Sequence, residues 1–483
     1  MLMGVAWAGL TVFLALYILF FGLLNLPAPA LIALPLAALF GLLLLAHTPS
    51  GLMFTAFAIG PLGIVQAELA SVTVNLPEAL ILALAAKELL PRVLRGTLGD
   101  IEVPWRGIVL YLAVAGAILV YAFVKGNPPV AALQDCRQFT EYALLYVLIV
   151  AAVKEERQIR HIALAFLAGV LVLALHGIVQ RFTGIGIPGN QMVSDAVFHE
   201  SVRSGSFYGS TPLGALMVLG LGPALGLMMS TGWRVNQGIL LLVAAALITA
   251  AVFTNTRASW LAIALLLAVV FLGVRKSVPF VAVTVAGMIV FTVILGPIVA
   301  KRMQTLEISK SESSLLERVQ YYTTAMHIFK HRPVTGLGWG RYFDENLILL
   351  NERYIPANLP NLPVHMKAPE ATVHSAYLQL LVKGGIVTLG AFLVLMYLCA
   401  RGAWRAYRQG SGNPGRYHLF LGLSASVLGY LFHASLENFF QWPVMSQAFW
   451  LLAGLITVSA NLILREDEAR TSEAGVPALP GHA

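Results

Sequence analysis

The sequence predicts an all-α polytopic membrane protein, and three observations predict it. Of its 483 residues, 58% are hydrophobic and only 11% are charged, and the mean hydropathy is +0.80. Because soluble domains average about 25% charged residues, an ordinary globular protein is excluded. Apolar runs of roughly 18–25 residues recur along the chain, which is the length a helix needs to cross a bilayer. They lack the alternation of a membrane β-barrel.

We expect twelve to fourteen transmembrane helices. The number is open because Glu68, Asn75 and Glu78 interrupt the third and fourth apolar segments, which are either short or re-entrant. The first segment has no basic n-region and no small-residue cleavage site, so we expect a retained helix rather than a signal peptide. The predicted spans are 4–25, 28–46, 50–67, 75–91, 106–124, 137–153, 160–181, 211–230, 236–254, 257–274, 278–299, 374–400, 417–436 and 443–464.

The chain accordingly divides into four parts. Residues 1–299 and 374–464 form the N-terminal and C-terminal groups of transmembrane helices, and 300–373 is one large loop between them. The tail, 465–483, is polar and rich in proline and glycine, so we expect it to be disordered.

The distribution of lysine and arginine between the loops predicts how these helices are oriented in the membrane. Most of them fall in short loops on one side, which the positive-inside rule makes cytoplasmic, together with both termini. The net charge of +8 therefore reflects membrane orientation, and we expect no nucleic-acid partner. The residues on this side are Arg92, Arg95, Lys154, Arg157, Arg160, Arg234, Arg275, Lys276, Arg401, Arg405, Arg408, Arg416, Arg465 and Arg470.

The large loop lies on the opposite side and contains a predicted amphipathic helix, 313–331. Ser314 and Glu317 have the spacing of a capping box, and Pro333 ends the helix. One apolar stripe runs along it, made of Leu315, Val319, Tyr322, Met326 and Phe329. A glycine-rich turn follows, 334-VTGLGWGRYF-343.

Three arginines break the charge rule on this outer side. Arg203 lies in a loop after the span 160–181, Arg257 lies where two spans meet almost without a loop, and Arg181 ends a span. A charge so close to hydrocarbon is costly, so it usually faces a cavity or a partner. The residues alone leave two interpretations open. Either these side chains are solvated or snorkelling at the interface, or they hold an anion such as a phosphate.

His374 lies on the same side, just before a span. A histidine there is either a boundary residue or a general base, since the positive end of the helix dipole favours neutral imidazole. Glu437, also outer-facing, is a candidate to pair with an arginine or to orient a base. His176, inside a span, is expected to be a packing residue.

Common catalytic motifs are missing from the sequence. It contains no H-E-x-x-H, D-x-D, G-x-S-x-G or P-loop pattern, and His327, His331 and His365 lack metal-ligand spacing. The two cysteines, Cys136 and Cys399, belong to segments that end on opposite sides, so we expect neither a disulfide nor a zinc site. We therefore expect no metal and no cofactor.

Four motifs follow one another along the outer side. They are Arg203-Ser-Gly-Ser-Phe, Thr256-Arg257, a long loop with Arg318 and HRPVTGLGWGRYF, and His374-Ser-Ala-Tyr-Leu-Gln-Leu-Leu followed by Gly384 and Gly385. Taken in order, they resemble the O-antigen ligase family, which also includes O-antigen polymerases and bacterial protein O-oligosaccharyltransferases. The resemblance covers about 160–460. This chain has His374-Ser375 where the family often has His-Asn, and 209-GSTPL-213 where it often has Gly-x-Pro-Asn.

The resemblance implies a GT-C-like membrane glycosyltransferase. It would move a polysaccharide from undecaprenyl pyrophosphate to a sugar hydroxyl of lipid A–core, at the periplasmic face of the bacterial inner membrane, without a metal and with inversion. In that reaction His374 would be the general base, and Arg203 and Arg257 would hold the pyrophosphate. Arg318 and Tyr377 would be further candidates for substrate contact.

Three other functions remain open. An O-antigen or exopolysaccharide polymerase would use the same donor chemistry with a lipid-linked glycan as acceptor. A protein O-oligosaccharyltransferase is the second. The third, a lipid-linked oligosaccharide flippase or other transporter, would be expected to place charges near the bilayer midplane within internal repeats. Here the unusual charges gather at one face and we find no repeat.

Overall fold

The computed structural model describes residues 41, 46–69, 72–184, 193–194, 202–230, 236–274, 313–341, 373–410, 414–439 and 442–473. The predicted spans 4–25 and 278–299, and most of 28–46, lie outside these residues. The elements are α3 (Thr48–Ile59), β1 (Gln66–Leu69), β2 (Val72–Asn75), α4 (Leu76–Leu94), η1 (Leu98–Asp100), α5 (Trp105–Val124), α6 (Pro129–Ala152), α7 (Glu156–Thr183), β3 (Val193–Ser194), β4 (Val202–Arg203), α8 (Ser210–Met229), α9 (Gln237–Phe253), α10 (Arg257–Gly273), α12 (Ser313–His331), α14 (Ala376–Gln409), α15 (Pro414–Ala434) and α16 (Pro443–Glu473).

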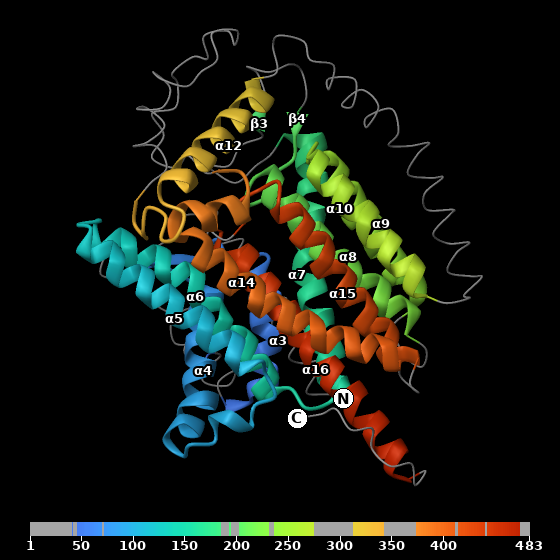
Figure 1. The fold of residues 1–483 in the computed structure, drawn as a ribbon. Helices are drawn as coiled ribbons and strands as arrows, with labels where there is room; N and C mark the ends of the chain where they lie inside the picture. Colours follow the sequence, from blue (N-terminus) through green and yellow to red (C-terminus); the bar gives the residue numbers. More distant parts are fainter. Residues whose placement is uncertain are drawn as a thin grey trace, which may run out of the picture.

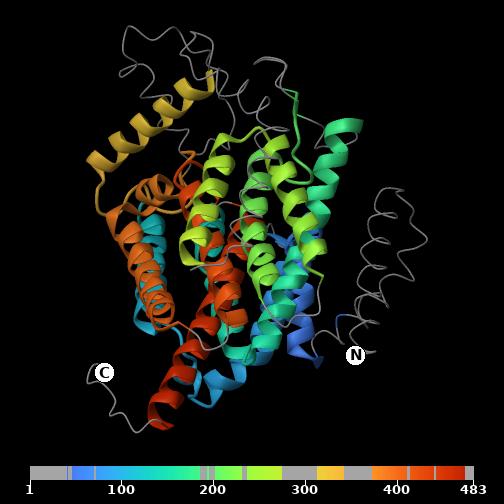
Figure 2. The same ribbon diagram turned by 90° about the vertical axis from the view of Figure 1, so that its right-hand side faces the viewer.

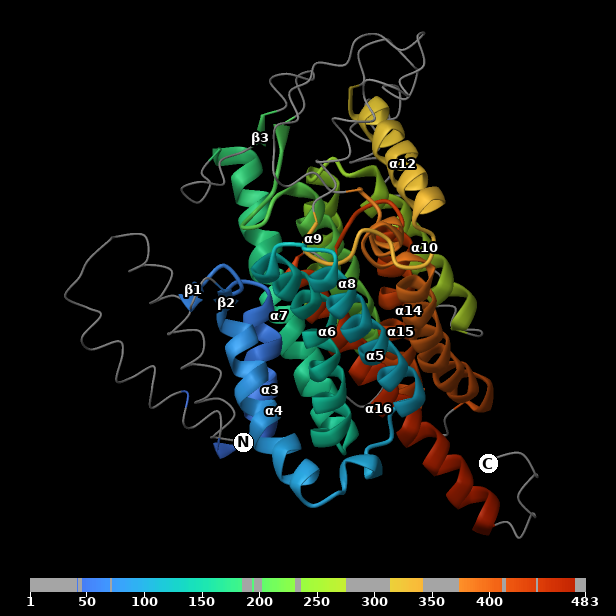
Figure 3. The same cartoon turned by 60° about the vertical axis from the view of Figure 1, so that its left-hand side comes forward.

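Helices dominate the described residues and pack as one bundle (Figure 1). Within this part of the chain, five helices are long and apolar enough to cross a membrane, namely α5, α7, α8, α14 and α16. The prediction of an all-α multi-pass membrane protein is confirmed. The two short antiparallel hairpins, β1–β2 and β3–β4, are additions to the bundle, and Figure 3 shows the first beside α3 and α4.

Close helix contact in the centre of the bundle depends on small residues. A Cβ at Gly222 of α8 would lie 2.1 Å from the carbonyl oxygen of Gly422 in α15. Ser426 of α15 accepts a hydrogen bond from the Gly222 amide at 3.0 Å. Small residues allow such approach where lipid offers no hydrophobic driving force between helices. The α8–α15 pair therefore fixes the middle of the molecule.

Basic residues that the sequence placed on one side do meet at one end of the bundle. Arg416 bonds the Glu156 carboxylate at 3.1 Å. Burial, followed by the positive charges of Arg92 and Arg465, lowers the pKa of Lys154 in the α6–α7 loop. We call this the basic end. Helix α12 lies outside the bundle at the opposite end (Figure 2).

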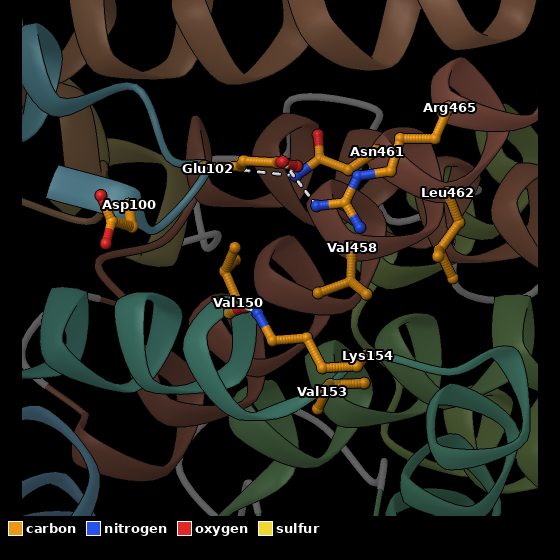
Figure 4. A pocket seen from close by; sticks show the side chains of 9 residues that line it. All are labelled: Asp100, Glu102, Val150, Val153, Lys154, Val458, Asn461, Leu462 and Arg465. Carbon is orange, nitrogen blue, oxygen red and sulfur yellow. Dashed lines mark hydrogen bonds and ion pairs between the residues drawn. The ribbon is translucent and has the colours of Figure 1, made fainter. Parts of the chain in front are cut away.

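A cavity opens at the basic end (Figure 4). Glu102 lines it. The Glu102 carboxylate accepts a hydrogen bond from Arg465 at 2.5 Å, and the Glu102 backbone carbonyl accepts one from the Asn461 side chain at 3.1 Å. Its lining is completed by Asp100, Val150, Val153, Lys154, Val458 and Leu462. Because His374 lies at the other end, this cavity is separate from the candidate site.

Several predicted spans differ from the helices of the structure. The span 50–67 is wrong, because α3 ends at Ile59 and Pro61 cannot continue the helix that Gly60 caps. Helix α6 begins earlier than predicted, at Pro129. Helix α14 is interrupted at Gly385. Helix α16 runs on to Glu473, so the first residues of the tail are helical rather than disordered.

Candidate active site

The backbone around His374 is held in an unusual conformation. Its φ is +48°, in the left-handed region that side chains other than glycine rarely adopt. Contacts on both sides hold it there. The Tyr322 hydroxyl donates to the His374 carbonyl at 3.2 Å, Ser375 caps α14 with its side chain, and the Ala376 amide donates to the Glu437 carbonyl at 3.2 Å. The histidine is therefore placed by three separate elements.

The side chain of His374 pairs with Glu437. Nδ1 of the ring lies 2.9 Å from Oε2 of the carboxylate. The other oxygen, Oε1, accepts from Nη2 of Arg318 at 2.5 Å, and Nη1 of Arg318 donates to the Leu436 carbonyl at 3.2 Å. The Glu437 side chain is 9% exposed, whereas that of His374 is 36% exposed. One face of the imidazole thus remains accessible while its partner is buried.

This arrangement keeps Glu437 ionised and fixes which ring nitrogen of His374 faces it. Burial raises the pKa of Glu437, but the hydrogen bond from His374 and the charge of Arg318 outweigh it, so the pKa lies below its ordinary value. An ionised carboxylate only accepts hydrogen bonds, so Nδ1 of His374 carries the proton. Nε2, on the opposite side of the ring, points away from the carboxylate. The result is a half-exposed histidine oriented by a buried carboxylate.

Helix α12 brings Arg318 to this pair. A small apolar cluster, separate from the main core, joins α12 to α14, and the ring of Tyr321 lies 5.4 Å from that of His374. The cluster consists of Tyr321, Ala325, Ile328, Leu337, Val373 and Val382. Tyr321 and Tyr322 were not singled out as site residues from the sequence. Their spacing from Arg318, three and four residues on, is the signal that places them on the same face of the helix.

The three arginines predicted on the outer side come from segments that meet at the α9–α10 turn. The Ser204 amide, directly after Arg203, donates to the Phe253 carbonyl at 3.0 Å. The guanidinium of Arg181 lies 5.9 Å from the centre of the Phe253 ring. Arg257 begins α10 four residues later and is half-buried. The Arg203 side chain is outside the described part, so only its backbone is placed here.

The segment after Arg203 is held from α7. The Gly205 and Ser206 amides both donate to Oε1 of Gln180 at 2.9 Å. The Ser206 hydroxyl also lies 3.1 Å from Nδ1 of His176. His176 is thus bonded within the fold, as expected for a packing residue.

Backbone strain marks the same places. Within the described residues, three residues other than glycine have positive φ: Ser206 at +49°, Asn255 at +52° and His374 at +48°. Ser206 follows Arg203 by three positions, and Asn255 precedes Arg257 by two. Such conformations cost roughly 1–3 kcal/mol each and gather at functional sites. Positive φ therefore occurs at His374 and within three residues of Arg203 and Arg257.

Helix packing places Arg257 at the same end of the bundle as the His374–Glu437 pair. Helices α10 and α15 run antiparallel, and a Cβ at Gly429 would lie 3.0 Å from the Ala262 carbonyl oxygen. Because the helices are antiparallel, five residues forward from Gly429 reach the same level as five residues back from Ala262. Ala434 therefore lies at the level of Arg257. The loop that carries Glu437 begins directly after Ala434. Arg257 and the His374–Glu437 pair therefore share one end of the bundle.

Tyr377 has a different environment from the rest. Its hydroxyl donates to the Leu431 carbonyl at 2.9 Å, which holds α14 against α15.

Among the described residues, no three His, Cys, Asp or Glu side chains gather as metal ligands.

The sequence was compared with curated proteins and with protein-family models. No curated protein matches the sequence. A family model described as O-antigen ligase matches residues 241–393. That segment includes Arg257, Arg318 and His374, while Arg203 and Glu437 lie outside it. The match confirms the resemblance to the O-antigen ligase family over residues 241–393.

Proposed function

We propose that this chain is an O-antigen ligase. It transfers O-antigen polysaccharide from undecaprenyl pyrophosphate to a sugar hydroxyl of lipid A–core, and so completes lipopolysaccharide. The observation that carries the proposal is the pairing of half-exposed His374 with buried Glu437 and Arg318, inside and beside a family-matched domain. The positive-inside rule supports a cytoplasmic basic end, and we therefore assign this pair, at the opposite end, to the periplasmic face of the inner membrane.

The pair supplies the base for an in-line displacement. The acceptor hydroxyl oxygen attacks the anomeric carbon and gives its proton to Nε2 of His374. A new bond forms from this oxygen to the carbon, while the bond from the carbon to the pyrophosphate oxygen breaks with inversion. General-base help of this kind is worth roughly 10²–10⁴ in rate. Glu437 stabilises the imidazolium that forms.

The leaving group needs positive charge, since undecaprenyl pyrophosphate departs as an anion. Arg257 and Arg203 are assigned to its oxygens, because a guanidinium fork matches phosphate geometry and can replace a divalent metal in this role. Arg181, beside Phe253, adds a third charge nearby. Arg318 takes a different part from the substrate contact expected from sequence: its ion pair with Glu437 makes it a residue that orients the carboxylate.

The experiment is the lipopolysaccharide pattern of a deletion strain, complemented with variants. Wild-type chain restores smooth lipopolysaccharide, and His374→Ala does not. Arg465→Gln serves as the matched control, because Arg465 lies at the basic end and is 54% exposed. It restores the wild-type pattern.

The banding also separates the alternatives. Rough lipopolysaccharide with accumulated long lipid-linked polymer supports the ligase. A core that carries a single repeat identifies a polymerase instead. The deletion strain could instead retain smooth lipopolysaccharide and lose glycoprotein or the export of lipid-linked oligosaccharide. That result would assign the chain to protein glycosylation or transport and overturn the proposal.

A further inference from the structure

Helix α14 is broken a short distance after His374. Gly385 has φ +63° and ψ −166°, values that no helical residue adopts. The first segment, Ala376 to Gly384, is thereby separated from the rest of α14. In an uninterrupted helix the Ile386 amide would donate to the Val382 carbonyl. Here both groups need other partners.

The loop after α12 supplies these partners. The Ile386 amide donates to the Pro333 carbonyl at 2.8 Å, and the Val382 carbonyl accepts from the Leu337 amide at 2.8 Å. The Gly338 amide donates to the Lys383 carbonyl at 2.9 Å. Backbone outside a helix is tolerated at membrane depth when protein satisfies it in this way. The loop therefore takes over the hydrogen bonds that the break removes.

Glycine is required for this approach. A Cβ at Gly385 would lie 2.1 Å from the Val334 carbonyl oxygen, and one at Gly336 would lie 2.3 Å from the Val382 carbonyl oxygen. Both glycines also have positive φ. The glycines of 334-VTGLGWGR-341 and of the α14 break are thus two halves of one contact.

An ion pair ties the break to α6. Nζ of Lys383 lies 2.5 Å from Oδ1 of Asp135, and Oδ2 of Asp135 accepts from the Gly340 amide at 2.8 Å. The two side chains are 7% and 16% exposed. A buried ionisable pair is costly to retain, and Lys383 lies in the candidate membrane span α14, so the pair points to a function.

Asn127 and Trp339 complete the attachment to the α5–α6 hairpin. Asn127, 2% exposed, donates to the Leu337 and Trp339 carbonyls at 3.1 and 2.8 Å and accepts from Nε of Arg341 at 3.0 Å. The buried indole of Trp339 donates to the Ala115 carbonyl at 2.9 Å. Figure 1 shows this loop beside the end of the hairpin. We call the loop 333–341, Lys383–Gly385, Asn127 and Asp135 the joint.

We propose that Asp135 and Lys383 are positioning residues for glycan transfer, because through the joint they set the angle of the α14 segment that carries His374. This inference rests on the proposed function. The segment is about 13 Å long at 1.5 Å per residue, so a rotation of about 5° at Gly385 displaces His374 by about 1 Å. A misplacement of that size costs about 10²-fold in rate.

Neutral variants of the pair separate positioning from stability. Lys383→Met and Asp135→Asn each leave one buried charge unpaired, and the asparagine still accepts from the Gly340 amide. Each single variant lowers the Tm and lowers kcat about 10- to 100-fold, with KM within about threefold. The double variant has no unpaired charge, so its Tm recovers while kcat stays low. Recovery of kcat together with Tm, or a loss confined to KM, overturns the proposal.

The matched control is the ion pair at the basic end. Arg465→Met with Glu102→Gln removes a pair of similar length, 2.5 Å, far from the joint. It leaves kcat unchanged. A loss of kcat equal to that of the Lys383 and Asp135 variants would show a general effect of removing ion pairs and would also overturn the proposal.

A distance measurement tests the joint without any substrate. Spin labels at Met326 on α12 and Val130 on α6, 41% and 53% exposed, report its rigidity once Cys136 and Cys399 are replaced by serine. Wild type gives one narrow distance distribution, and Lys383→Met broadens it. An unchanged distribution overturns the joint even if transfer is confirmed. A broadened distribution in a protein that transfers no glycan would support the joint and refute the proposed function.

Discussion

Replacing Glu437 by glutamine tests the base most sharply, because it preserves shape and removes charge. The carboxylate accepts from Nδ1 of His374 at 2.9 Å and from Nη2 of Arg318 at 2.5 Å. A guanidinium has only donors, so the amide oxygen of glutamine turns to Arg318 and its NH₂ group faces Nδ1. Nδ1 must then accept, and the ring proton moves to Nε2. The base is thereby in the wrong tautomer.

The magnitude follows from two estimates that agree. Losing a general base costs roughly 10²–10⁴ in rate. Losing the negative charge about 4 Å from the imidazolium removes about 4 kcal/mol at an effective dielectric constant of about 20. Since about 1.4 kcal/mol is tenfold, this corresponds to about 10³ in kcat. We expect Glu437→Gln to lower kcat by about 10³ and to leave KM for both substrates nearly unchanged.

The assay is transfer of lipid-linked glycan to lipid A–core by the purified variant in proteoliposomes, with kcat and KM measured separately. Glu437→Asp is the control, because it keeps the charge on a shorter side chain and should lose less activity than the glutamine variant. A Glu437→Gln enzyme with kcat within threefold of wild type would refute the carboxylate-oriented base.

Three further predictions use the same preparation. Arg257→Lys keeps the charge but loses the fork, so its kcat should fall about tenfold or more, and unaltered turnover would remove the bidentate phosphate contact. Exhaustive chelation should leave transfer intact; loss restored by one divalent ion would contradict metal-independent chemistry. Because the folded pKa of Glu437 is depressed, its stabilisation is full above the ordinary value of about 4.3 and is lost as pH falls through the lower folded value. The Tm gap between wild type and Glu437→Gln should therefore be constant above about pH 5 and shrink in more acidic buffer, and a gap that persists there argues against the ion pair.

Local patterns predicted most of the helices, named the members of the site and made Glu437 a candidate to pair with an arginine or to orient a base. They did not show which arginine or which histidine it contacts. Helix α12 occupies the predicted residues, 313–331, because the proline that ends it is a local signal. The predicted stripe is wrong, because the helix buries Tyr321, Ala325 and Ile328 and leaves Met326 41% exposed. Glu437 lies 63 residues from His374, and the packing of α14 against α15 and α16 brings the two together. The contact between Arg318 and Glu437 depends on packing in the same way, so the sequence led us to expect that Arg318 contacts substrate.

Ser375 shows what a family pattern conveys physically. The family often has asparagine at this position. Here the serine side chain accepts from the third amide of α14, at 3.4 Å, and acts as its N-cap. Serine and asparagine are comparable N-caps, so the substitution retains the backbone role. The departure therefore leaves the placement of His374 intact.

The break in α14 is the largest feature that the sequence did not reveal. Residues 374–400 were predicted as one span, because hydropathy is continuous across Gly384 and Gly385. Whether two glycines break a helix depends on what approaches them. In this fold the Pro333–Gly338 segment does so, and no local pattern predicts a contact about 50 residues away along the chain.

The central claim is that His374 takes the proton of the acceptor hydroxyl. Its most direct measurement compares wild type with His374→Ala in the reconstituted transfer reaction, with Tm recorded for both proteins. We predict an unchanged Tm and a loss of roughly 10³-fold or more in kcat for the variant. Transfer by a folded His374→Ala protein within a few-fold of wild type would contradict the claim.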